Sequence, residues 1–331
     1  MKDMRKSPLI IVTGGAGFIG SCFLWQLNQK GLNQIILIDE SDSEAKEKNL
    51  RNKQFIDYID KKDFIAKIKK NSFSKGVQAV FHIGACSSTT ETSQDYLWQN
   101  NLEYSKTLCQ WSLENNALFY YASSAAAYGN GSFGYSDDDK LTPKLKPLNL
   151  YGQSKQLFDL WAIENKIIKE ITGFRYFNVF GPNEYHKKDM RSLVVKAFEQ
   201  IKKDKKIRLF KSYKKEYADG EQKRDFIYIK DVIDLMWQFY QAPHIKGIYN
   251  LGAGKARTWN DLAKAIFTAL NLPVNIEYID MPKEIKDKYQ YFTQADLTKL
   301  KSTGLKYNPL PLEESVKDYV INYLEKGFAC L

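Results

Sequence analysis

The sequence contains few of the residues that form disulfides and metal sites. Its four cysteines, at positions 22, 86, 109 and 330, are widely spaced and include no C-x-x-C pair. Its three histidines, at positions 82, 186 and 244, are scattered along the 331 residues. Free thiols in a reducing cytoplasm are the simplest interpretation, and no metal site is expected.

Long apolar segments are also absent. No hydrophobic run approaches the ~20 residues that a membrane-spanning helix needs. The basic start "MKDMRKSPLIIVTGG" lacks the apolar core and cleavage site of a secretory signal peptide. We therefore expect a cytoplasmic protein without membrane contact. Hydrophobic residues make up 44% of the chain, which is ordinary for a globular protein. Its length suffices for roughly two domains, or for one domain with an elaborated lobe.

Positive charge exceeds negative charge, and the formal net charge is +10. Lysine-rich runs at 61–71 and 201–215 carry much of the excess. Such runs most often form a solvated surface, and the alternative is an electrostatic field that attracts an anionic substrate. No nucleic-acid-binding motif accompanies the charge, so a nucleic-acid partner is not expected.

The most informative segment is "LIIVTGGAGFIGSCFLWQLNQKGLNQIILIDE" at 9–40. It reads as a buried strand, a glycine-rich turn, an amphipathic helix to about residue 30 and a second strand. In such a β-α-β unit Gly14 permits the tight turn, Gly17 lets the backbone approach a pyrophosphate, and Gly20 lets the helix pack closely on the strand. The helix N-terminus then faces the anion. Because Asp39 stands where an acid can bind a ribose hydroxyl, the segment predicts a dinucleotide site.

A second motif is "YGQSK", in which Tyr151 precedes Lys155 by four residues. Residues at this spacing lie on one face of a helix. A nearby cation stabilises a phenolate and lowers the pKa of a tyrosine, which can then exchange protons near neutral pH. Taken alone, the pair is more often a surface tyrosine beside a solvated lysine.

The G-x-x-G-x-x-G spacing and the Tyr-x-x-x-Lys pair together resemble the extended short-chain dehydrogenase/reductase superfamily. The resemblance implies that Tyr151 transfers a proton beside a nicotinamide, and that Lys155 lowers the pKa of Tyr151 and binds the nicotinamide ribose. The segment "LFYYASSAAAYG" reads as a strand that ends in hydroxyl groups. Ser124 there matches the catalytic serine of the superfamily, which hydrogen-bonds the reacting oxygen.

Strands and helices alternate along the chain to about residue 182. This pattern predicts an α/β fold, a doubly wound parallel (Rossmann) sheet that binds its ligand at the carboxyl ends of the strands. We expect the dinucleotide-binding domain to comprise residues 1–182 and about 224–254. A smaller substrate-binding lobe is expected from about 183–223 and 255–331.

Six segments, spread over almost the whole chain, resemble the ADP-L-glycero-D-manno-heptose 6-epimerase family. They are "GACSSTTE" (84–91), "YASSAAAYG" (121–129), "YGQSK" (151–155), "GFRYFNVFGPNEYHK" (173–187), "RDFIYIKD" (224–231) and "YQYFTQADLTKL" (289–300). A 4,6-dehydratase would need Asp and Glu where Ala125 and Ala126 stand, so that reaction is rejected. The resemblance implies an isomerase that inverts C6 of an ADP-heptose by transient oxidation and re-reduction, in lipopolysaccharide inner-core precursor synthesis.

The resemblance also implies a second acid/base. When the intermediate aldehyde rotates, its oxygen moves away from the tyrosine, so one tyrosine serves both half-reactions poorly. The family places a lysine after F-G-P-x-E-x-H, and here that residue is Lys187. Such a lysine needs a lowered pKa, which a nearby cation or a closed pocket can supply. Without the resemblance, Lys187 would be interpreted as a solvated loop lysine.

The same resemblance assigns the remaining site residues by motif. The expected cofactor-binding residues are Gly14, Gly17, Phe18, Ile19, Gly20, Asp39, Glu40, Lys46, Lys61, Ile83, Gly84, Ala85, Cys86, Ser87, Asn100, Tyr151, Lys155 and Val179. The expected substrate-binding residues are Asn178, Asp189, Lys196, Phe210, Lys211, Ser212, Arg224 and Tyr289. Among them, Arg224 is the natural partner of a diphosphate because a guanidinium fork suits phosphate oxygens.

Opposing features bear on the choice of cofactor. Asp39 and Glu40 favour NAD because they repel a 2′-phosphate, whereas Lys46, Lys61 and the family resemblance favour NADP. We expect NADP, with NAD as the alternative. The resemblance further implies a homo-oligomer, a pentamer or larger.

Several positions in the predicted substrate lobe depart from the family pattern. Lys188 and Asp189 replace a small residue and a serine, Lys196 replaces a histidine, and the segment 212–222 is longer than in the shortest members. A variant heptose or another sugar nucleotide therefore stays open as the substrate.

Two other functional classes stay open. A UDP-hexose 4-epimerase manages with one tyrosine, so Lys187 argues against it. A non-catalytic dinucleotide sensor has no need of Ser124, Tyr151 and Lys155 together, so these residues argue against the sensor.

Overall fold

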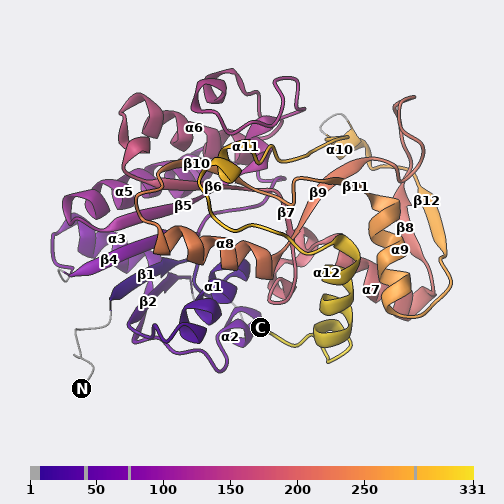
Figure 1. Cartoon of the computed structure of the whole chain (residues 1–331), viewed down its shortest axis with the longest axis horizontal. Coiled ribbons are helices and arrows are strands. Elements are labelled where there is room, and N and C mark those ends of the chain that lie inside the picture. Colours follow the sequence, from indigo (N-terminus) through magenta and orange to yellow (C-terminus); the bar gives the residue numbers. More distant parts are fainter. Residues whose placement is uncertain (1–7, 41–43, 74–75, 287–288) are drawn as a thin grey trace.

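A sheet of seven parallel strands forms the centre of the molecule (Figure 1). The computed structural model describes residues 8–40, 44–73, 76–286 and 289–331. The strand order is β10-β6-β5-β4-β1-β2-β3, so the chain begins in the middle of the sheet and winds outwards in both directions. This order confirms the predicted doubly wound sheet. The strands are β1 (Leu9–Thr13), β2 (Ile35–Asp39), β3 (Asp57–Asp60), β4 (Val77–His82), β5 (Leu118–Ser124), β6 (Thr172–Tyr176) and β10 (Gly247–Leu251).

Helices cover both faces of this sheet (Figure 1). On one face lie α1 (Phe18–Gln29) and α8 (Ile229–Gln241); on the other lie α3 (Lys61–Lys69), α5 (Tyr104–Glu114) and α6 (Leu150–Glu164). Successive residues of β1 point to opposite faces, so Ile10 and Val12 join one hydrophobic core and Ile11 joins the other. Burial on both faces explains why the central strands are continuous apolar runs.

Two smaller sheets lie beyond the carboxyl ends of the central strands. One contains β7 (Asn178–Phe180), β9 (Lys223–Tyr228) and β11 (Ala256–Thr258) in the order β11-β9-β7. The other pairs β8 (Ile207–Phe210) with β12 (Ile276–Ile279), beside α7 (Leu193–Asp204) and α9 (Trp259–Ala269) at the right of Figure 1. Of the segments expected to return to the central domain, β10 and α8 do so, whereas β9 pairs within a small sheet. The division into two domains stays a prediction.

Shorter elements complete the chain. The short α-helices are α2 (Glu44–Asn49), α4 (Gln94–Leu97), α10 (Lys283–Lys286), α11 (Thr298–Ser302) and α12 (Leu312–Tyr319). The 3₁₀ and π segments are η1 (Trp98–Glu103), η2 (Ala125–Tyr128), η3 (Asp139–Lys144), η4 (Ile167–Lys169), η5 (Tyr185–Met190) and η6 (Val320–Leu324). Within the described part of the chain, no helix has both the length and the apolar character needed to cross a membrane.

A buried ion pair connects α6 to β6. Asp159 Oδ2 accepts hydrogen bonds from Arg175 Nε at 3.1 Å and Nη2 at 2.9 Å, and both side chains are completely buried. The same carboxylate accepts hydrogen bonds from Tyr121 and Ser123 on β5, each at 2.9 Å. These bonds satisfy the Asp159 oxygens and compensate for the burial of two charges.

We predict that Asp159→Ala lowers the free energy of unfolding by about 3–5 kcal/mol, because it leaves the Arg175 guanidinium buried without its counter-ion. Urea unfolding followed by circular dichroism measures the change. The control is Glu199→Ala, which breaks the more exposed pair between Glu199 Oε1 and Arg191 Nη1 (2.6 Å) and should cost less than about 1 kcal/mol. Equal losses in the two variants would contradict the prediction.

Candidate active site

A cavity of about 940 Å³ lies at the carboxyl ends of the central strands, between the large sheet and the small sheets. Open α/β sheets bind their ligands at this edge. The structure places all eighteen residues expected to bind the cofactor on the cavity wall. The same cavity is also lined by the four expected catalytic residues, Ser124, Tyr151, Lys155 and Lys187.

The glycine-rich loop between β1 and α1 leaves room for a phosphate group. Gly14 has a φ of +67°, and a Cβ atom there would lie 2.6 Å from the backbone of Gly84. A Cβ atom on Gly20 would lie 2.1 Å from the carbonyl oxygen of Gly14, so only glycine lets α1 begin this close to β1. Gly17 precedes α1, and no described side chain caps this helix. Its first N–H groups therefore suit a pyrophosphate, and the loop fits a dinucleotide.

Two acid–lysine pairs lie where β2 ends. Asp39 accepts a hydrogen bond from Ala16 N in the glycine loop at 2.9 Å, and Lys46 Nζ lies 3.2 Å from Asp39 Oδ1. The next residue, Glu40, pairs with Lys61 Nζ at 2.6 Å. Each carboxylate therefore has a cation beside it, which reduces its repulsion of an anionic ligand group.

Ser124, Tyr151 and Lys155 come together where β5 ends and α6 begins. Ser124 Oγ accepts a hydrogen bond from Ala126 N at 3.1 Å. Asn149 caps α6 by accepting a hydrogen bond from Gly152 N at 2.8 Å, and the helix then begins at Leu150. Tyr151 and Lys155 consequently lie one turn apart, as the sequence predicts. The Lys155 ammonium donates a hydrogen bond to the Ala122 carbonyl at 2.9 Å.

Burial determines the pKa values of this pair. Burial raises the pKa of Tyr151, and a hydrogen bond with Ser124 opposes the shift. Burial lowers the pKa of Lys155 to about 8, and the Asp159 carboxylate opposes that shift. From the sequence we expected Lys155 to lower the pKa of Tyr151, but in the structure the cost of desolvating a phenolate is the larger effect, and the pKa of Tyr151 is raised.

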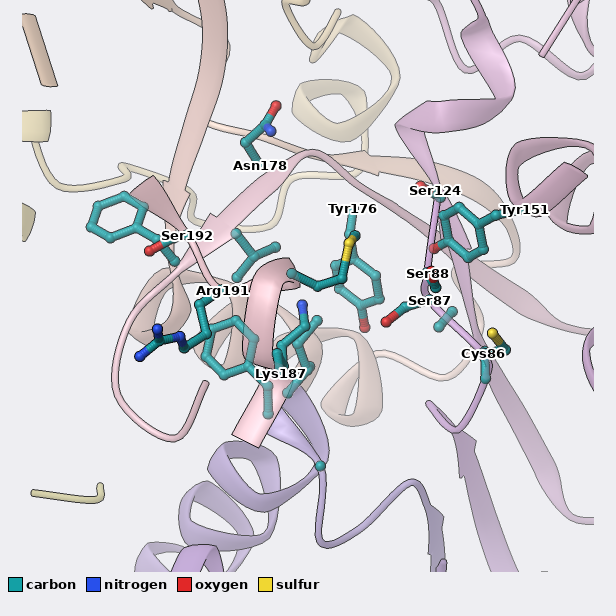
Figure 2. A pocket seen from close by; sticks show the side chains of 18 of the residues that line it. Cys86, Ser87, Ser88, Ser124, Tyr151, Tyr176, Asn178, Lys187, Arg191 and Ser192 are labelled. Carbon is teal, nitrogen blue, oxygen red and sulfur yellow. The ribbon is translucent and has the colours of Figure 1, made fainter. Parts of the chain in front are cut away.

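Lys187 enters the cavity from η5, after the small-sheet strand β7. Its ammonium nitrogen lies 5.5 Å from the ring centre of Phe18, the first residue of α1. Burial lowers the pKa of Lys187. Figure 2 shows Lys187 and Tyr151 on opposite sides of the cavity, with Tyr176 and Ser87 between them in this view. The cavity thus holds two groups that can exchange protons, one on each side.

Glu184 and His186 are ionisable residues that lie near Lys187 in the chain: Glu184 is buried and His186 is half-buried. Glu184 accepts hydrogen bonds from Ser192 N at 2.5 Å, Ser192 Oγ at 2.7 Å and Tyr319 OH at 3.2 Å. Burial raises the pKa of Glu184. Burial and, to a smaller extent, the charges of Lys187 and Lys46 lower the pKa of His186 to about 4. His186 is therefore neutral at pH 7.

The expected substrate residues divide into two groups. On the cavity wall lie Asn178, Lys196, Phe210 and Tyr289. Four others do not belong to the described wall: Asp189, Lys211, Ser212 and Arg224. The Arg224 guanidinium lies behind the aromatic wall, 5.0 Å from the Tyr289 ring centre and 5.7 Å from that of Trp259, and it donates a hydrogen bond to the Lys223 carbonyl at 2.9 Å.

Sequence reasoning missed a further group of wall residues. They include Ser88, Tyr96, Tyr104, Tyr176, Met190, Arg191, Ser192, Gln200, Arg208 and Trp259. Arg191 and Arg208 are the arginines of the described wall, where the sequence led us to expect Arg224; their guanidinium groups pair with Glu199 and with Asp204 and Glu277, respectively. The position of Tyr176 at the carboxyl end of a central strand was a usable signal, whereas the two arginines follow no motif.

The arrangement places a group that can exchange protons on each side of the cavity. Within the described ranges, no three His, Cys, Asp or Glu side chains are grouped so that they could hold a metal ion. The ionisable residues of the described cavity wall are five tyrosines, five lysines, two arginines, two histidines, two acids (Asp39 and Glu40) and one cysteine.

Comparison with known proteins agrees with this geometry. Residues 10–252 match the model of the NAD dependent epimerase/dehydratase family. The chain belongs to this family. An ADP-L-glycero-D-manno-heptose-6-epimerase of Nitratidesulfovibrio vulgaris is 49% identical over 316 residues, which cover 96% of this chain and 98% of that protein. A protein of the same name from Fusobacterium nucleatum is 45% identical over 327 residues, with the same coverage. The resemblance to heptose epimerases is thereby confirmed.

Solved structures place this family member among sugar-nucleotide epimerases. The ADP-L-glycero-D-manno-heptose-6-epimerase of Helicobacter pylori is 27% identical, has a TM-score of 0.79, and covers 97% of this chain and 98% of its own. A UDP-N-acetylglucosamine 4-epimerase from Methanobrevibacter ruminantium, in complex with UDP-N-acetylmuramic acid, is 25% identical with the same TM-score and covers 97% and 100%. Because the fold is common to both, the side chains of the site must distinguish the reactions.

We predict that Cys86 is alkylated by iodoacetamide at pH 8 and that saturating dinucleotide protects it, because Cys86 lies on the cavity wall and alkylation needs access. Burial raises the pKa of Cys22 and raises that of Cys109 to about 12, so both should stay unmodified. Cys330, outside the described wall, is the control whose alkylation dinucleotide should not change. Peptide mass spectrometry gives the extent at each site, and no protection of Cys86 would contradict a cofactor in this cavity.

Proposed function

We propose that the protein inverts C6 of an ADP-linked heptose with bound NADP, using Tyr151 and Lys187 as two acid/bases. The observation that carries the proposal is the placement of these two groups on opposite sides of one cavity. When bound, the nicotinamide supplies a hydride acceptor and donor at one sugar carbon, and the positive charge of its oxidised ring favours the phenolate form of Tyr151. Similarity to proteins named heptose epimerases supports the choice of substrate.

Tyr151 would serve the first face of the sugar. Its phenolate accepts the proton of the C6 hydroxyl, and Ser124 donates a hydrogen bond that orients the same oxygen. Lys155 stays close through its bond to the Ala122 carbonyl and contributes positive charge beside the phenolate. Tyr151 is half-buried on the cavity wall, and a bound sugar and nicotinamide would cover its hydroxyl and exclude water that competes for the proton.

Lys187 would serve the second face. Rotation of the aldehyde carries its oxygen away from Tyr151, and a proton must reach the oxygen from the other side when the hydroxyl reforms. Lys187 lies on that side, and burial lowers its pKa. A lysine with a lowered pKa releases its proton more readily than an ordinary surface lysine, which suits a group that must both give and regain a proton.

The far end of the cavity would hold the nucleotide diphosphate of the substrate. Lys196, Arg191 and Arg208 supply cations there, and Phe210, Trp259 and Tyr289 supply aromatic surface. Guanidinium groups bind phosphate oxygens through two parallel hydrogen bonds. Arg191 here pairs with Glu199, and Arg208 pairs with Asp204 and Glu277, so a bound diphosphate would take the place of these carboxylates. We therefore assign the substrate-binding lobe to residues of about 183–223 and 255–331, as the sequence led us to expect, with Arg191 and Arg208 in the role first given to Arg224.

The wider context follows from the same proposal. We place the reaction in the synthesis of lipopolysaccharide inner-core precursors and expect a cytoplasmic homo-oligomer. Size-exclusion chromatography with light scattering measures the oligomeric state directly.

NADP is our choice between the two dinucleotides. The oxygens of Asp39 already accept hydrogen bonds from Ala16 N and Glu40 N, at 2.9 and 2.8 Å, so this carboxylate helps to shape the glycine loop. Lys46 and Lys61 stand beside the two acids and would offer cations to a 2′-phosphate.

We predict that the purified protein releases NADP on denaturation, because an epimerase returns its hydride and has no reason to exchange the cofactor at each turnover. Chromatography of the released nucleotide identifies it. In titrations of nucleotide-free protein, Lys61→Ala should weaken NADP binding more than NAD binding, because only NADP carries a 2′-phosphate on its adenosine ribose. Recovery of NAD alone, or equal losses for both nucleotides, would contradict the choice.

We predict that Tyr151→Phe and Lys187→Met each reduce epimerisation about 10²–10⁴-fold, the range usual for a general acid/base. A substrate analogue with an aldehyde at C6 separates the two roles, because its hydrate can be oxidised and its carbonyl reduced without inversion. Each single variant should keep part of this disproportionation, and the double variant should lose nearly all of it. Product analysis by NMR gives both rates.

The outcomes distinguish the two candidate reactions. If Lys187→Met epimerises at the unaltered rate, the two-base mechanism is wrong. A UDP-hexose 4-epimerase with a single tyrosine would then be the better candidate, since a UDP-N-acetylglucosamine 4-epimerase has a similar fold, and incubation with UDP-hexoses would test it.

A further inference from the structure

The segment that carries Lys187 begins at a completely buried asparagine. Asn183 follows Pro182, has a φ of +75° and is 0% exposed. Positive φ is costly for most side chains, and asparagine tolerates it better than other residues with a Cβ atom. A polar residue in this position needs its hydrogen bonds to be satisfied within the protein.

Asn183 bonds to three separate parts of the chain. Its side-chain nitrogen donates to Ser21 Oγ on α1 at 2.9 Å, and its side-chain oxygen accepts from Leu331 N at 2.8 Å. Its carbonyl oxygen accepts a hydrogen bond from Asn49 Nδ2, at the end of α2, at 3.1 Å. Both the nitrogen and the oxygen of the side-chain amide therefore have hydrogen-bond partners, and a smaller or purely apolar side chain could not replace these bonds.

These bonds lead back to Lys187 through the first turn of α1. Ser21 Oγ, which accepts from Asn183, donates to the Phe18 carbonyl at 3.2 Å. The ring of Phe18 is the surface against which the Lys187 ammonium lies, 5.5 Å from its centre. The start and the end of the segment 183–187 therefore contact the same helical turn.

Asn49 reinforces this connection. Its side-chain nitrogen lies 3.0 Å from the Ala16 carbonyl in the glycine loop and 3.3 Å from His186 Nδ1, the residue before Lys187. Asn49 thus connects both Asn183 and His186 to the glycine loop.

We propose that Asn183 is a positioning residue that fixes the Lys187 amine opposite Tyr151 by attaching its segment to the first turn of α1. The proposal rests on the function proposed above for Lys187. Asn183 itself does not reach the cavity wall among the described residues, so it acts through Lys187 and contacts no substrate. The competing explanation is that Asn183 only stabilises the fold.

A double-mutant cycle separates these explanations. Asn183→Gly keeps the positive φ but removes the amide. Because a displacement of about 1 Å can cost about 10²-fold in rate, the variant should lower kcat for epimerisation roughly ten- to a hundredfold with little change in KM. In a Lys187→Met background the same change should alter the residual rate less than about twofold, because the group being positioned is gone.

The second measurement does not depend on catalysis. Acetylation of Lys187 by acetic anhydride, followed by peptide mass spectrometry across a pH series, gives the midpoint at which its amine becomes reactive. Loosening the segment exposes the amine to water, so Asn183→Gly should raise this midpoint towards that of an ordinary lysine. The matched control is Asn271→Gly, an exposed asparagine with a φ of +53° at the end of α9, which should leave both midpoint and kcat unchanged.

Ser21→Ala provides a milder variant should Asn183→Gly fold poorly. It removes the acceptor of the Asn183 side-chain nitrogen and the hydrogen bond from Ser21 to the Phe18 carbonyl, and it leaves the other bonds of Asn183 in place. It should therefore give a smaller change of the same kind in both measurements. Bound nucleotide and melting temperature confirm that each variant is folded.

The outcomes are distinct. An equal loss of kcat in the wild-type and Lys187→Met backgrounds, with an unchanged acetylation midpoint, would overturn the proposal in favour of a structural role. If Lys187→Met epimerises normally, the two-base function fails, and the acetylation midpoint still decides whether Asn183 holds the lysine in place.

Discussion

The close approach of the glycine loop to α1 and β4 is the constraint on which the rest of the site depends. A Cβ atom on Gly14 would strike Gly84, and one on Gly20 would strike the Gly14 carbonyl. The backbone of the glycine loop therefore packs directly against the backbone of its neighbours. No side chain of Gly14 or Gly20 fills the space at the end of β1, where the cavity lies. Asp39 and Asn49 both bond to Ala16 within this loop, so the ends of β2 and α2 take their positions from it.

Burial is the main physical influence on the reactive groups once the cavity has formed. Desolvation penalises the charged form of every group, so it raises the pKa of Tyr151 and lowers the pKa values of Lys155 and Lys187. Without bound cofactor, Tyr151 therefore loses its proton less readily than a free tyrosine, whereas Lys155 and Lys187 lose theirs more readily than a free lysine. The Asp159 carboxylate raises the pKa of Lys155 and so offsets part of the effect of burial. The ion pair of Asp159 with Arg175 also links α6 to β6 in the core.

Much of the cofactor half could be predicted from the sequence, because its signals are local. The order of strand, glycine loop and helix at 9–40 and the spacing of Tyr151 and Lys155 are properties of a few neighbouring residues, and the structure reproduces them. The substrate end was predicted less well. Arg224 has the right chemistry for a diphosphate, but it packs behind Tyr289, whereas Arg191 and Arg208 reach the wall from a loop and a small sheet. Their positions depend on packing between distant segments, which no local pattern encodes.

The sequence by itself determined the doubly wound sheet, the dinucleotide loop and the family, since backbone conformation and helical spacing follow from nearby residues. Tertiary structure alone decided that Lys187 lies across the cavity from Tyr151. The two residues are 36 positions apart in the sequence, so their distance in space depends on how the segments between them fold. It also decided the direction of the Tyr151 pKa shift, because desolvation depends on the whole surrounding wall. The role of Asn183 belongs to the same class, since its partners Ser21, Asn49 and Leu331 meet only when α1, α2 and the end of the chain have packed together.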